Sequence, residues 1–455
     1  MKLDRDTITA CATAPGKGGI GVVRISGSKS LEIVRQITLP TFKQLIPRKA
    51  QFFNFTDHQK NIIDHGLVVY FPAPNSFTGE DVIELQGHGS PVVMDLLVES
   101  LIHHGARLAS PGEFSERAFL NDKLDLAQAE AIADLIDSGS QAAARSAMRS
   151  LQGEFSKLIS NLIEQLIRLR VYIEAAIDFP EEEIDYLGDE KLKISLNNII
   201  NQVQCCLDQA QQGVLLKEGL HVVIAGKPNA GKSSLLNRLA GDERAIVTAI
   251  PGTTRDVLRE TIHIDGLPIH IIDTAGLRIS DDVVEQEGIR RAWLEIEKAD
   301  LILLVVDASE IKNNNFQELW PFPERQPDFN KVLVIQNKMD LVDSSLVGII
   351  EENHQAVIKL SAKSGEGIIE FKNYLKQRSH YHPNESSFSA RRRHVSALQE
   401  AHAALLTAKN SLAQKSGELF AEDLRLTQAH LGKITGVVTA DDLLGEIFSS
   451  FCIGK

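Results

Sequence analysis

The sequence predicts a multidomain protein with an N-terminal α+β domain, an all-α central domain, and an α/β domain inserted into the helical one. The first observation is length, because 455 residues correspond to about three domains at roughly 100–200 residues each. The second is that segments of helical pattern flank a stretch in which β-rich apolar runs alternate with helices. The third is a set of short Val- and Ile-rich runs near the N-terminus, which are typical of strands.

The N-terminal domain is predicted to cover residues 1–120. Strands are expected at Ile20–Ile25, Gly66–Phe71 and Asp81–Leu85, which are rich in Val and Ile and bounded by Gly, Pro or Asn. A helix is expected at Pro91–His104. Strands with helical segments between them indicate an α+β domain.

The helical domain is predicted in two parts, residues 121–217 and 381–455. The first part contains apolar residues at spacings of three and four, which mark one face of a helix. These residues are Leu158, Leu162, Leu166, Leu169 and Ile173. A second helical pattern runs over Lys191–Leu216, and the tail Ser389–Lys455 is helical again.

The α/β domain is predicted at residues 218–380, between the two helical parts. Its alternating strands and helices indicate a parallel sheet with crossover helices. Insertion is feasible because the two ends of a domain often lie close together. The expected strands are His221–Ala225, Ile269–Ile272, Leu301–Val306, Val332–Ile335 and Val357–Leu360.

Charge and composition exclude several classes of protein. Lys plus Arg number 48 and Asp plus Glu number 61, so the net charge of −13 argues against a surface that binds nucleic acid everywhere. The four cysteines form no C-x-x-C pair, which excludes a disulfide framework and a zinc knuckle. The first residues lack the apolar core of a signal peptide, and the longest apolar run, Leu301–Val306, is too short for a bilayer. We therefore expect a cytoplasmic location and no membrane partner.

One loop has the pattern of a phosphate-binding loop. Gly226–Ser233 matches G-x-x-x-x-G-K-[ST], follows the strand His221–Ala225 and precedes a predicted helix, Ser234–Leu239. Glycines let the backbone N–H groups face the phosphates, and the helix N-terminus adds partial positive charge. We expect Lys232 to reach the β- and γ-phosphates and the Ser233 hydroxyl to bind Mg²⁺.

Two later segments have the pattern of nucleotide switches. Asp273 would hold Mg²⁺ through water, and the N–H group of Gly276 would sense the γ-phosphate. Thr253-Thr254 would bind Mg²⁺ and report the γ-phosphate, although an ordinary turn after Pro251-Gly252 is the alternative.

The next residue after Gly276 is Leu277, where Ras-like GTPases have a water-orienting glutamine. Hydrolysis must therefore be helped by another side chain, a cation or a partner.

Two motifs predict which nucleotide base the protein recognises. Asn337-Lys338-Met339-Asp340 follows the strand Val332–Ile335, and a carboxylate there can accept two hydrogen bonds from guanine N1 and N2. Adenine lacks that donor pair and would leave the carboxylate poorly paired. Ser361-Ala362-Lys363 follows the strand Val357–Leu360 and would support the base. In this order, each after a strand, the motifs indicate a guanine-specific GTPase.

Six segments together resemble one known family. They are Gly226–Ser234, Ile250–Asp256, Asp273–Arg278, Cys452-Ile453-Gly454-Lys455, Asn75–Asp81 and Pro111–Phe119. The sequence is similar to the MnmE (TrmE) family of tRNA modification GTPases over essentially its whole length. A GTP-switch module for ribosome assembly is the competing class, but such a module needs neither the N-terminal segments nor the Cys-Ile-Gly-Lys end.

The resemblance implies a fold and a reaction. The N-terminal domain would bind tetrahydrofolate and form a homodimer, the central domain would be helical, and the inserted domain would be the G domain. With a flavoprotein partner, MnmG (GidA), in a heterotetramer, such proteins add an aminomethyl or carboxymethylaminomethyl group to carbon 5 of wobble uridine 34 in certain tRNAs. A 5-formyl- or 5,10-methylene-type tetrahydrofolate supplies the one-carbon unit, and FAD and NADH work in the partner.

The motifs and the resemblance together assign a full set of GTP contacts. The set is Asn229, Ala230, Gly231, Lys232, Ser233, Ser234, Thr248, Ala249, Ile250, Pro251, Gly252, Thr253, Thr254, Asp273, Thr274, Ala275, Gly276, Asn337, Lys338, Asp340, Ser361, Ala362 and Lys363. Among these, Ser233 and Thr254 would bind Mg²⁺.

The resemblance also implies K⁺-stimulated hydrolysis in a dimer of G domains, with K⁺ in place of an arginine finger. The K⁺ ligands would be Asn229, Thr248, Ile250 and Thr253. A bridging cation can offset charge that develops in the transition state. Glu285 would orient the attacking water through a second water, and Lys232 and Asn229 would be the other catalytic residues; from the pattern alone, Glu285 would be read as part of a solvated helix face. Arg255, Asp256 and Arg278 would be switch residues that couple GTP to modification.

For folate, the resemblance implies Arg24, Glu84, Lys123 and Lys455. A carboxylate and cationic side chains suit a pterin edge and a glutamate tail, whereas the pattern alone would read these residues as surface charges. Cys452 would lie near the folate with a redox or nucleophilic role, or would be a small buried residue. Arg391-Arg392-Arg393 could contact tRNA phosphates or begin a helix.

Overall fold

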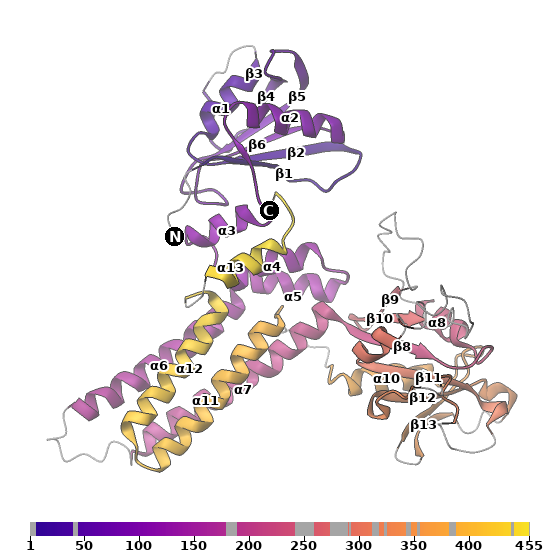
Figure 1. Ribbon diagram of the computed structural model, residues 1–455. Helices are drawn as coiled ribbons and strands as arrows, with labels where there is room; N and C mark the ends of the chain where they lie inside the picture. The colour runs from indigo at the N-terminus through magenta and orange to yellow at the C-terminus, as the bar shows by residue number, and fades with distance from the viewer. Residues whose placement is uncertain are drawn as a thin grey trace. The chain divides into compact units, whose positions relative to one another are not determined.

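The computed structural model describes residues 6–39, 44–178, 189–241, 259–273, 290, 293–311, 318–322, 325–342, 347–352, 355–381, 388–437 and 441–454. The chain divides into two compact units (Figure 1). Unit 1 contains Met1–Ala133, Ser150–Ile200 and Glu400–Lys455, and unit 2 contains Asp134–Arg149 and Asn201–Gln399.

Within its described residues, unit 1 contains a seven-stranded sheet with the strand order β3-β4-β5-β6-β2-β1-β7. The neighbouring strands pair antiparallel except β1 and β7, which pair parallel. The strands are β1 (Ile8–Cys11), β2 (Gly18–Ser26), β3 (Thr38–Leu39), β4 (Gln51–Thr56), β5 (Ile62–Phe71), β6 (Val82–Gly89) and β7 (Arg107–Leu108). The strands predicted at Ile20–Ile25, Gly66–Phe71 and Asp81–Leu85 correspond to β2, β5 and β6.

One face of this sheet packs on two helices, α1 (Ser30–Ile37) and α2 (Pro91–His103) (Figure 1). Alternate residues of the strands, such as Val23, Val68 and Leu85, are buried against them. The residues between them point to the other face, where Phe52 is 65% exposed and its cross-strand neighbour Leu67 is 39% exposed. This second face is therefore partly apolar and open to solvent.

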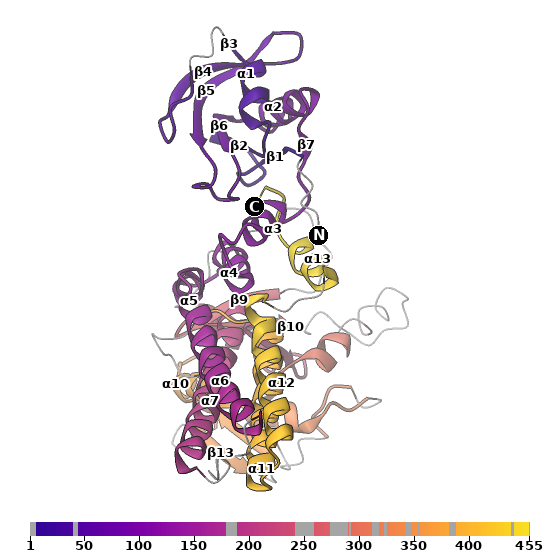
Figure 2. The same cartoon turned by 90° about the vertical axis from the view of Figure 1, so that its left-hand side faces the viewer.

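Two long helices of unit 1 pack lengthwise. α6 (Glu154–Asp178) and α12 (Gly417–Thr435) lie side by side (Figure 2), and Arg170 donates a hydrogen bond of 2.8 Å to Gln428 between them. Of the five residues that predicted α6, four are buried and Leu158 is 41% exposed. Other described helices with residues in this unit are α3 (Glu113–Leu120), α4 (Leu126–Ile136), α7 (Glu190–Glu218), α11 (Arg392–Ala413), α13 (Asp441–Ser449) and the end of α5 (Gln141–Leu151).

The described residues of unit 2 form a second seven-stranded sheet, in the order β13-β14-β12-β11-β8-β10-β9. Its central strands are parallel, and β9 and β13 pair antiparallel at the two edges. The strands are β8 (Leu220–Ala225), β9 (Arg259–Ile264), β10 (Leu267–Asp273), β11 (Leu301–Asp307), β12 (Val332–Asn337), β13 (Gly348–Glu352) and β14 (Gln355–Lys359). The predicted inserted α/β fold is thus confirmed, with two antiparallel edges that the sequence pattern did not indicate.

Both faces of this sheet are buried, as a parallel sheet requires. One face packs on α8 (Lys232–Ala240) and α10 (Ile368–Arg378), and the other packs on a cluster that includes Trp293 and Trp320. α5 (Gln141–Leu151) also belongs to unit 2, as do the 3₁₀ turns Ala308–Glu310, Phe329–Lys331 and Met339–Leu341. No helix of the described segments is long and apolar enough to cross a membrane.

The strand order reverses at β8. β8 lies between β10 and β11 in the sheet. The chain therefore crosses from one side of β8 to the other when it passes from β10 to β11. Ligands of open α/β sheets bind at such a reversal, beside the carboxyl ends of the strands. The loop that follows β8 therefore lies where a ligand is expected.

Candidate functional site

The loop between β8 and α8 adopts a backbone that only glycine accepts at two positions. Gly226 and Gly231 have φ angles of +146° and +93°, and Asn229 has φ +62°. A Cβ atom on Gly226 would lie 2.1 Å from the carbonyl oxygen of Val305, and one on Gly231 would lie 2.2 Å from Nδ2 of Asn337. The glycines thus let this loop pass directly against β11 and the end of β12.

Lys232 begins α8 and is 7% exposed. Its ammonium group donates hydrogen bonds to the carbonyl oxygens of Gly226 and Lys227, at 2.7 and 2.9 Å. The charge is therefore held inside the loop, at the helix N-terminus, where an anion is favoured. Ser233 and Ser234 are exposed in the first turn of α8. The loop has the cradle and the cation that a triphosphate needs.

Asn337 joins three segments of the site. Its side chain is buried, its amide donates to the carbonyl oxygen of Ala230 at 3.0 Å, and its Oδ1 accepts from the N–H group of Ala362 at 3.0 Å. One side chain at the end of β12 therefore fixes both the phosphate loop and the Ser361–Lys363 loop. The motifs predicted to bind opposite ends of one nucleotide are connected by this residue.

Asp340 is exposed and oriented by its neighbour. Ser361 donates a hydrogen bond of 2.6 Å to Oδ1 of Asp340 and accepts one of 3.1 Å from the N–H group of Ser364. Asp340 therefore presents a positioned carboxylate to solvent, as recognition of the guanine N1 and N2 donors requires.

Lys338 lies beside this carboxylate with φ +67° and forms an ion pair of 2.6 Å with Asp307. Burial would raise the pKa of Asp307, but hydrogen bonds from Lys338 and Ser309 hold it below its ordinary value. The aliphatic stem of Lys338 is thereby fixed at the end of β12, next to the predicted position of the base.

Arg238 is a site residue that the sequence reasoning missed. From α8 it donates to the carbonyl oxygens of Ala362 and Lys363, at 3.1 and 2.5 Å. It therefore holds the loop that supports the base. Only its place on the exposed face of α8, two turns after Lys232, could have drawn attention to it.

Several predicted residues lie outside the described segments. They are Thr248, Ala249, Ile250, Pro251, Gly252, Thr253, Thr254, Arg255, Asp256, Thr274, Ala275, Gly276, Arg278, Glu285 and Lys455. Asp273 is described only by its backbone, which ends β10 and pairs with Ile224 of β8. Their roles stay predictions.

In unit 1 the structure brings Arg24 and Glu84 together on the open face of the sheet. They are cross-strand partners of β2 and β6, and the guanidinium donates to Oε1 of Glu84 at 3.1 and 2.9 Å. The guanidinium also lies over the rings of Phe77 and Phe114, at 5.6 and 5.8 Å from their centres. A half-buried ion pair between aromatic rings is a suitable site for a flat polar heterocycle.

The chain end lies against the same sheet. The N–H group of Gly112 donates to the carbonyl oxygen of Cys452 at 3.3 Å, and a Cβ on Gly454 would lie 2.3 Å from the carbonyl oxygen of Cys11. β1 pairs with β2, and Ala10 is opposite Arg24. Cys452 is exposed, so the alternative of a buried cysteine is wrong.

Lys123 follows α3, and its Cε lies 3.3 Å from the position of a Cβ on Gly79. It therefore lies beside the loop that carries Phe77.

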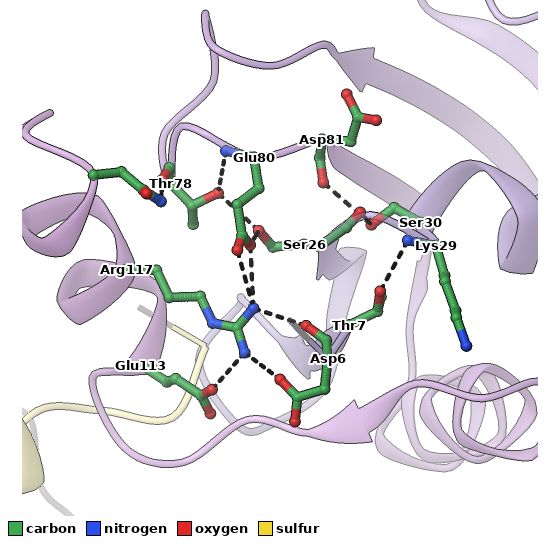
Figure 3. Close-up of polar contacts among 12 residues, drawn as sticks. Asp6, Thr7, Ser26, Lys29, Ser30, Thr78, Glu80, Asp81, Glu113 and Arg117 are labelled. Atoms are coloured by element: carbon green, nitrogen blue, oxygen red, sulfur yellow. Dashed lines mark hydrogen bonds and ion pairs between the residues drawn. The ribbon is translucent and has the colours of Figure 1, made fainter. Parts of the chain in front are cut away.

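A buried charge network supports this candidate site, and the sequence reasoning missed it (Figure 3). Arg117 of α3, with its side chain 5% exposed, donates to Asp6 at 2.7 Å, to Glu113 at 2.8 Å and to Glu80 at 3.2 Å. Glu80 also accepts a hydrogen bond of 2.8 Å from Ser26. The network fixes α3, the loop before β6 and the start of β1, which together carry the groups around Arg24.

The Arg391-Arg392-Arg393 cluster is explained by structure. Arg391 forms an ion pair of 2.9 Å with Asp134. Arg392, the first residue of α11, forms one of 2.7 Å with Glu218, the last residue of α7. Two of the three guanidinium groups are thus engaged within unit 2. This favours the interpretation of the cluster as a helix start.

Comparison with known proteins gives concordant matches. Residues 7–123 match the family model described as the GTP-binding protein TrmE N-terminus, and residues 126–452 match that of the MnmE helical domain. A curated relative from Marinobacter nauticus, the tRNA modification GTPase MnmE, is 57% identical over 460 residues and covers 100% of both chains.

Solved structures of G domains match about a third of this chain. The FeoB G domain from Methanococcus jannaschii is 26% identical, over 35% of this chain and 98% of its own, with a TM-score of 0.26. The G domain of the T. maritima FeoB iron transporter matches over the same shares at a TM-score of 0.25. At such scores neither match bears on the fold, which rests on the sheet topology described above.

Proposed function

The chain belongs to the MnmE family of tRNA modification GTPases, and from this we propose how it acts. It modifies carbon 5 of wobble uridine 34 in certain tRNAs, adding an aminomethyl or carboxymethylaminomethyl group together with the flavoprotein MnmG (GidA). Residues 1–120 bind folate and dimerise, 121–217 and 381–455 form the helical domain, and 218–380 form the G domain. The observation that carries the proposal is the connection of phosphate loop and base loops through Asn337.

In the G domain, the chain's own groups recognise the nucleotide. The exposed Asp340 carboxylate, oriented by Ser361, accepts the two donors of guanine. When GTP binds, the flexible side chain of Lys232 moves from the loop carbonyl oxygens to the β- and γ-phosphates. Its ammonium group then pairs with full negative charges instead of the partial charges of carbonyl groups. Gly226 and Gly231 keep the backbone close enough for its N–H groups to face the phosphates.

Two cations complete this site. Ser233 and Thr254 bind Mg²⁺, and the exposed Ser233 in the first turn of α8 suits that role. Asn229, Thr248, Ile250 and Thr253 bind K⁺; Asn229 holds a left-handed backbone at the top of the loop, which fits a side chain that caps the phosphates. The cations supply positive charge at the oxygens where negative charge develops. Glu285 orients water, and Arg255, Asp256 and Arg278 couple the nucleotide state to modification.

In the N-terminal domain, Arg24, Glu84, Lys123 and Lys455 bind a 5-formyl- or 5,10-methylene-type tetrahydrofolate. The residues fit this ligand, because the Arg24–Glu84 pair lies between two aromatic rings and is only half-buried. The folate supplies a one-carbon unit. Glu84 accepts hydrogen bonds from the pterin edge, and the two lysines hold its glutamate tail. A redox or nucleophilic role for Cys452 at this site is supported by its exposure on the segment that packs beside β1.

The open face of the N-terminal sheet supports the homodimer. Phe52 and Leu67 form an exposed apolar cross-strand pair there, and Glu84 points to the same face. A second copy would cover these side chains and enclose the folate site at once. The G domains pair separately, across the bound nucleotide.

The tRNA and the redox cofactors come with the partner. A chain with net charge −13, in which Arg391 and Arg392 are already paired, is poorly suited to hold a polyanion alone. FAD and NADH work in MnmG, and the heterotetramer of the two proteins supplies the phosphate contacts. The assembly works in the cytoplasm.

Asp340→Asn tests the nucleotide assignment. An amide offers one donor and one acceptor, so it pairs with xanthine and leaves guanine partly unpaired. We expect GTP affinity to fall at least a hundredfold and xanthosine triphosphate to be preferred. Asp328→Asn, at an Asp that caps a 3₁₀ turn elsewhere in the same domain, is the control and should leave both affinities unchanged. Retained GTP preference would contradict the assignment.

Nucleoside analysis tests the reaction itself. Bulk tRNA from cells that lack this protein should lose the carbon-5 substituents of wobble uridine, and the wild-type chain should restore them. Unchanged wobble uridines would instead favour a GTP-switch module without chemistry on tRNA.

A further inference from the structure

The β9–β10 hairpin connects two places of different character in unit 2. Its open end adjoins the segments predicted as switches, since β9 begins three residues after Asp256 and β10 ends at Asp273. The two strands pair antiparallel without a break from Leu267 opposite Ile264 to Ile272 opposite Arg259. Such a paired ribbon transmits a shift of one end to the other, because sliding would break its ladder.

The closed end of the hairpin packs on the junction between α4 and α5. Ser140 donates a hydrogen bond of 3.3 Å to the carbonyl oxygen of Gly266, and accepts one of 3.1 Å from the N–H group of Ala143. Ser140 therefore caps α5 and binds the turn at the same time. Gly266 has φ +87°, and a Cβ there would lie only 2.9 Å from Cβ of Ala142. The turn and the first residues of α5 are in direct contact.

The turn is also held from the G-domain side. Lys376 forms an ion pair of 2.6 Å with Asp265, and the hydroxyl of Tyr381 donates to the carbonyl oxygen of Asp265 at 3.0 Å. Along β10, His270 is hydrogen-bonded to Thr261 and to the carbonyl oxygen of Glu218, each at 3.0 Å. The hairpin is thus held at its turn by an ion pair and a hydrogen bond, and along β10 by hydrogen bonds of His270.

On the helical side of this contact, Asp134 binds the two segments that connect the G domain to the helices. Asp134 of α4 forms ion pairs of 2.8 Å with Lys217 and 2.9 Å with Arg391, and accepts a hydrogen bond of 2.6 Å from Ser389. Lys217 lies in the last turn of α7, and Ser389 and Arg391 lead into α11. Residues 134–142 therefore form one block that the hairpin turn touches at Ser140 and Ala142.

We propose that Ser140 and Ala142 are positioning residues that carry the nucleotide state of the G domain, through the β9–β10 hairpin, to α5. The physical reason is contiguity: the switches are joined covalently to the hairpin, and the hairpin turn packs on the helix cap. A change at the open end alters the packing of Gly266 on Ala142, so α5 is stabilised differently in the GDP and GTP states. The proposal needs only the GTPase activity of the family and does not depend on folate, K⁺ or the partner.

Hydrogen exchange on the full-length wild-type chain tests the connection directly. Backbone amides of residues 141–151 should exchange at rates that differ at least threefold between GDP and a non-hydrolysable GTP analogue. Equal exchange rates in the two states would overturn the proposal.

Ala142→Glu tests the residues. The larger charged side chain displaces the turn, so we expect the nucleotide dependence of exchange in α5 to disappear and tRNA modification in cells to fall at least tenfold, while GTP hydrolysis changes less than twofold. Gln141→Glu adds the same charge at the adjacent exposed position and should behave as wild type, and Ala142→Ser should retain modification. A parallel loss of hydrolysis and modification in Ala142→Glu, or wild-type modification, would overturn the proposal.

Discussion

The two sheets of the chain hold the charged groups of their candidate sites in different ways. In the α/β sheet the groups of the phosphate loop are held by backbone: Lys232 by two carbonyl oxygens, and the neutral side chain of Asn337 by a carbonyl oxygen and an N–H group. In the N-terminal sheet they are held by other charged side chains, as Arg24 is by Glu84 and Arg117 is by three carboxylates.

The difference decides what each site tolerates. Backbone partners stay in place when a side chain is replaced, so the nucleotide site depends on the shape of its loop. Buried charged partners are left uncompensated when one of them is removed, so the N-terminal site depends on the complete set. The expectations below test this distinction, from the largest effect to the smallest.

Arg117→Met should have the largest effect on stability. It leaves Asp6, Glu80 and Glu113 without a buried counter-charge, and we expect a loss of about 3–5 kcal/mol in the free energy of unfolding. Urea unfolding followed by circular dichroism measures it. Arg107→Met is the control, because Arg107 binds Asp6 and Glu113 but is 44% exposed, and it should cost less than about 1 kcal/mol. Equal losses in both variants would remove the distinction between the sites.

Gly231→Ala should weaken GTP binding at least a hundredfold, about 2.7 kcal/mol, with a smaller effect on unfolding. Its Cβ would meet Nδ2 of Asn337 at 2.2 Å and force the loop away from β12. Gly348→Ala is matched, since Gly348 also has a positive φ but an added Cβ would meet no atom within 4 Å. Calorimetric titration with GTP compares them, and similar affinities would show that backbone shape is not the determinant.

Acid should destabilise the N-terminal network. The hydrogen bond from Arg107 is the largest cause of the lowered pKa of Asp6. Burial would raise the pKa of Glu113, but hydrogen bonds from Arg107, Ser110 and Arg117 outweigh it. Carboxylates with lowered folded-state pKa stabilise the fold above the unfolded value, so this stability is lost as the pH falls below about 4. Wild-type unfolding should show a loss of about 1 kcal/mol there, and Arg107→Met should reduce this loss, because Arg107 gives the strongest lowering of both pKa values; identical pH profiles would argue against the network.

Ser361→Ala should have the smallest effect. It removes one hydrogen bond that orients the exposed Asp340, and we expect GTP to bind about three- to tenfold more weakly. Ser364→Ala, at an exposed serine in the same loop, should change binding less than twofold. If Ser361→Ala binds GTP like wild type, the carboxylate is oriented by other contacts.

The same distinction explains what the sequence could predict. Gly226–Ser233 and Asn337–Asp340 were identified because a backbone-built site needs fixed residue types at consecutive positions. Arg117 and its carboxylates lie up to 111 residues apart, so no local pattern connects them. Arg238 was missed because its partners are carbonyl oxygens, which any residue supplies. Leu158 satisfied the helical spacing yet is exposed, because spacing alone does not say where a covered face ends.

Whether a strand could be predicted from the sequence depended on how fully the strand is buried. The buried central strands β8, β10, β11, β12 and β14 were all predicted, because strands covered on both faces are continuous apolar runs. The edge strands β9 and β13 were not, since each has only two apolar residues beside several polar ones and is bordered on one side only. In the N-terminal sheet β1 and β4 were missed for a similar reason, as both are short segments with polar residues between the buried ones.

The packing of residues 448–454 against Gly112 and Cys11 has a consequence for the order of folding. An added Cβ on Gly112 would lie 2.5 Å from the carbonyl oxygen of Phe448, so the fit between these segments is close. During synthesis the first sheet emerges before the helical and α/β regions, whereas residues 448–454 emerge after them. The sheet must therefore keep the surface beside β1 uncovered while the helical and α/β regions are made. Its candidate ligand site is completed only when a segment made later in synthesis returns to one made earlier.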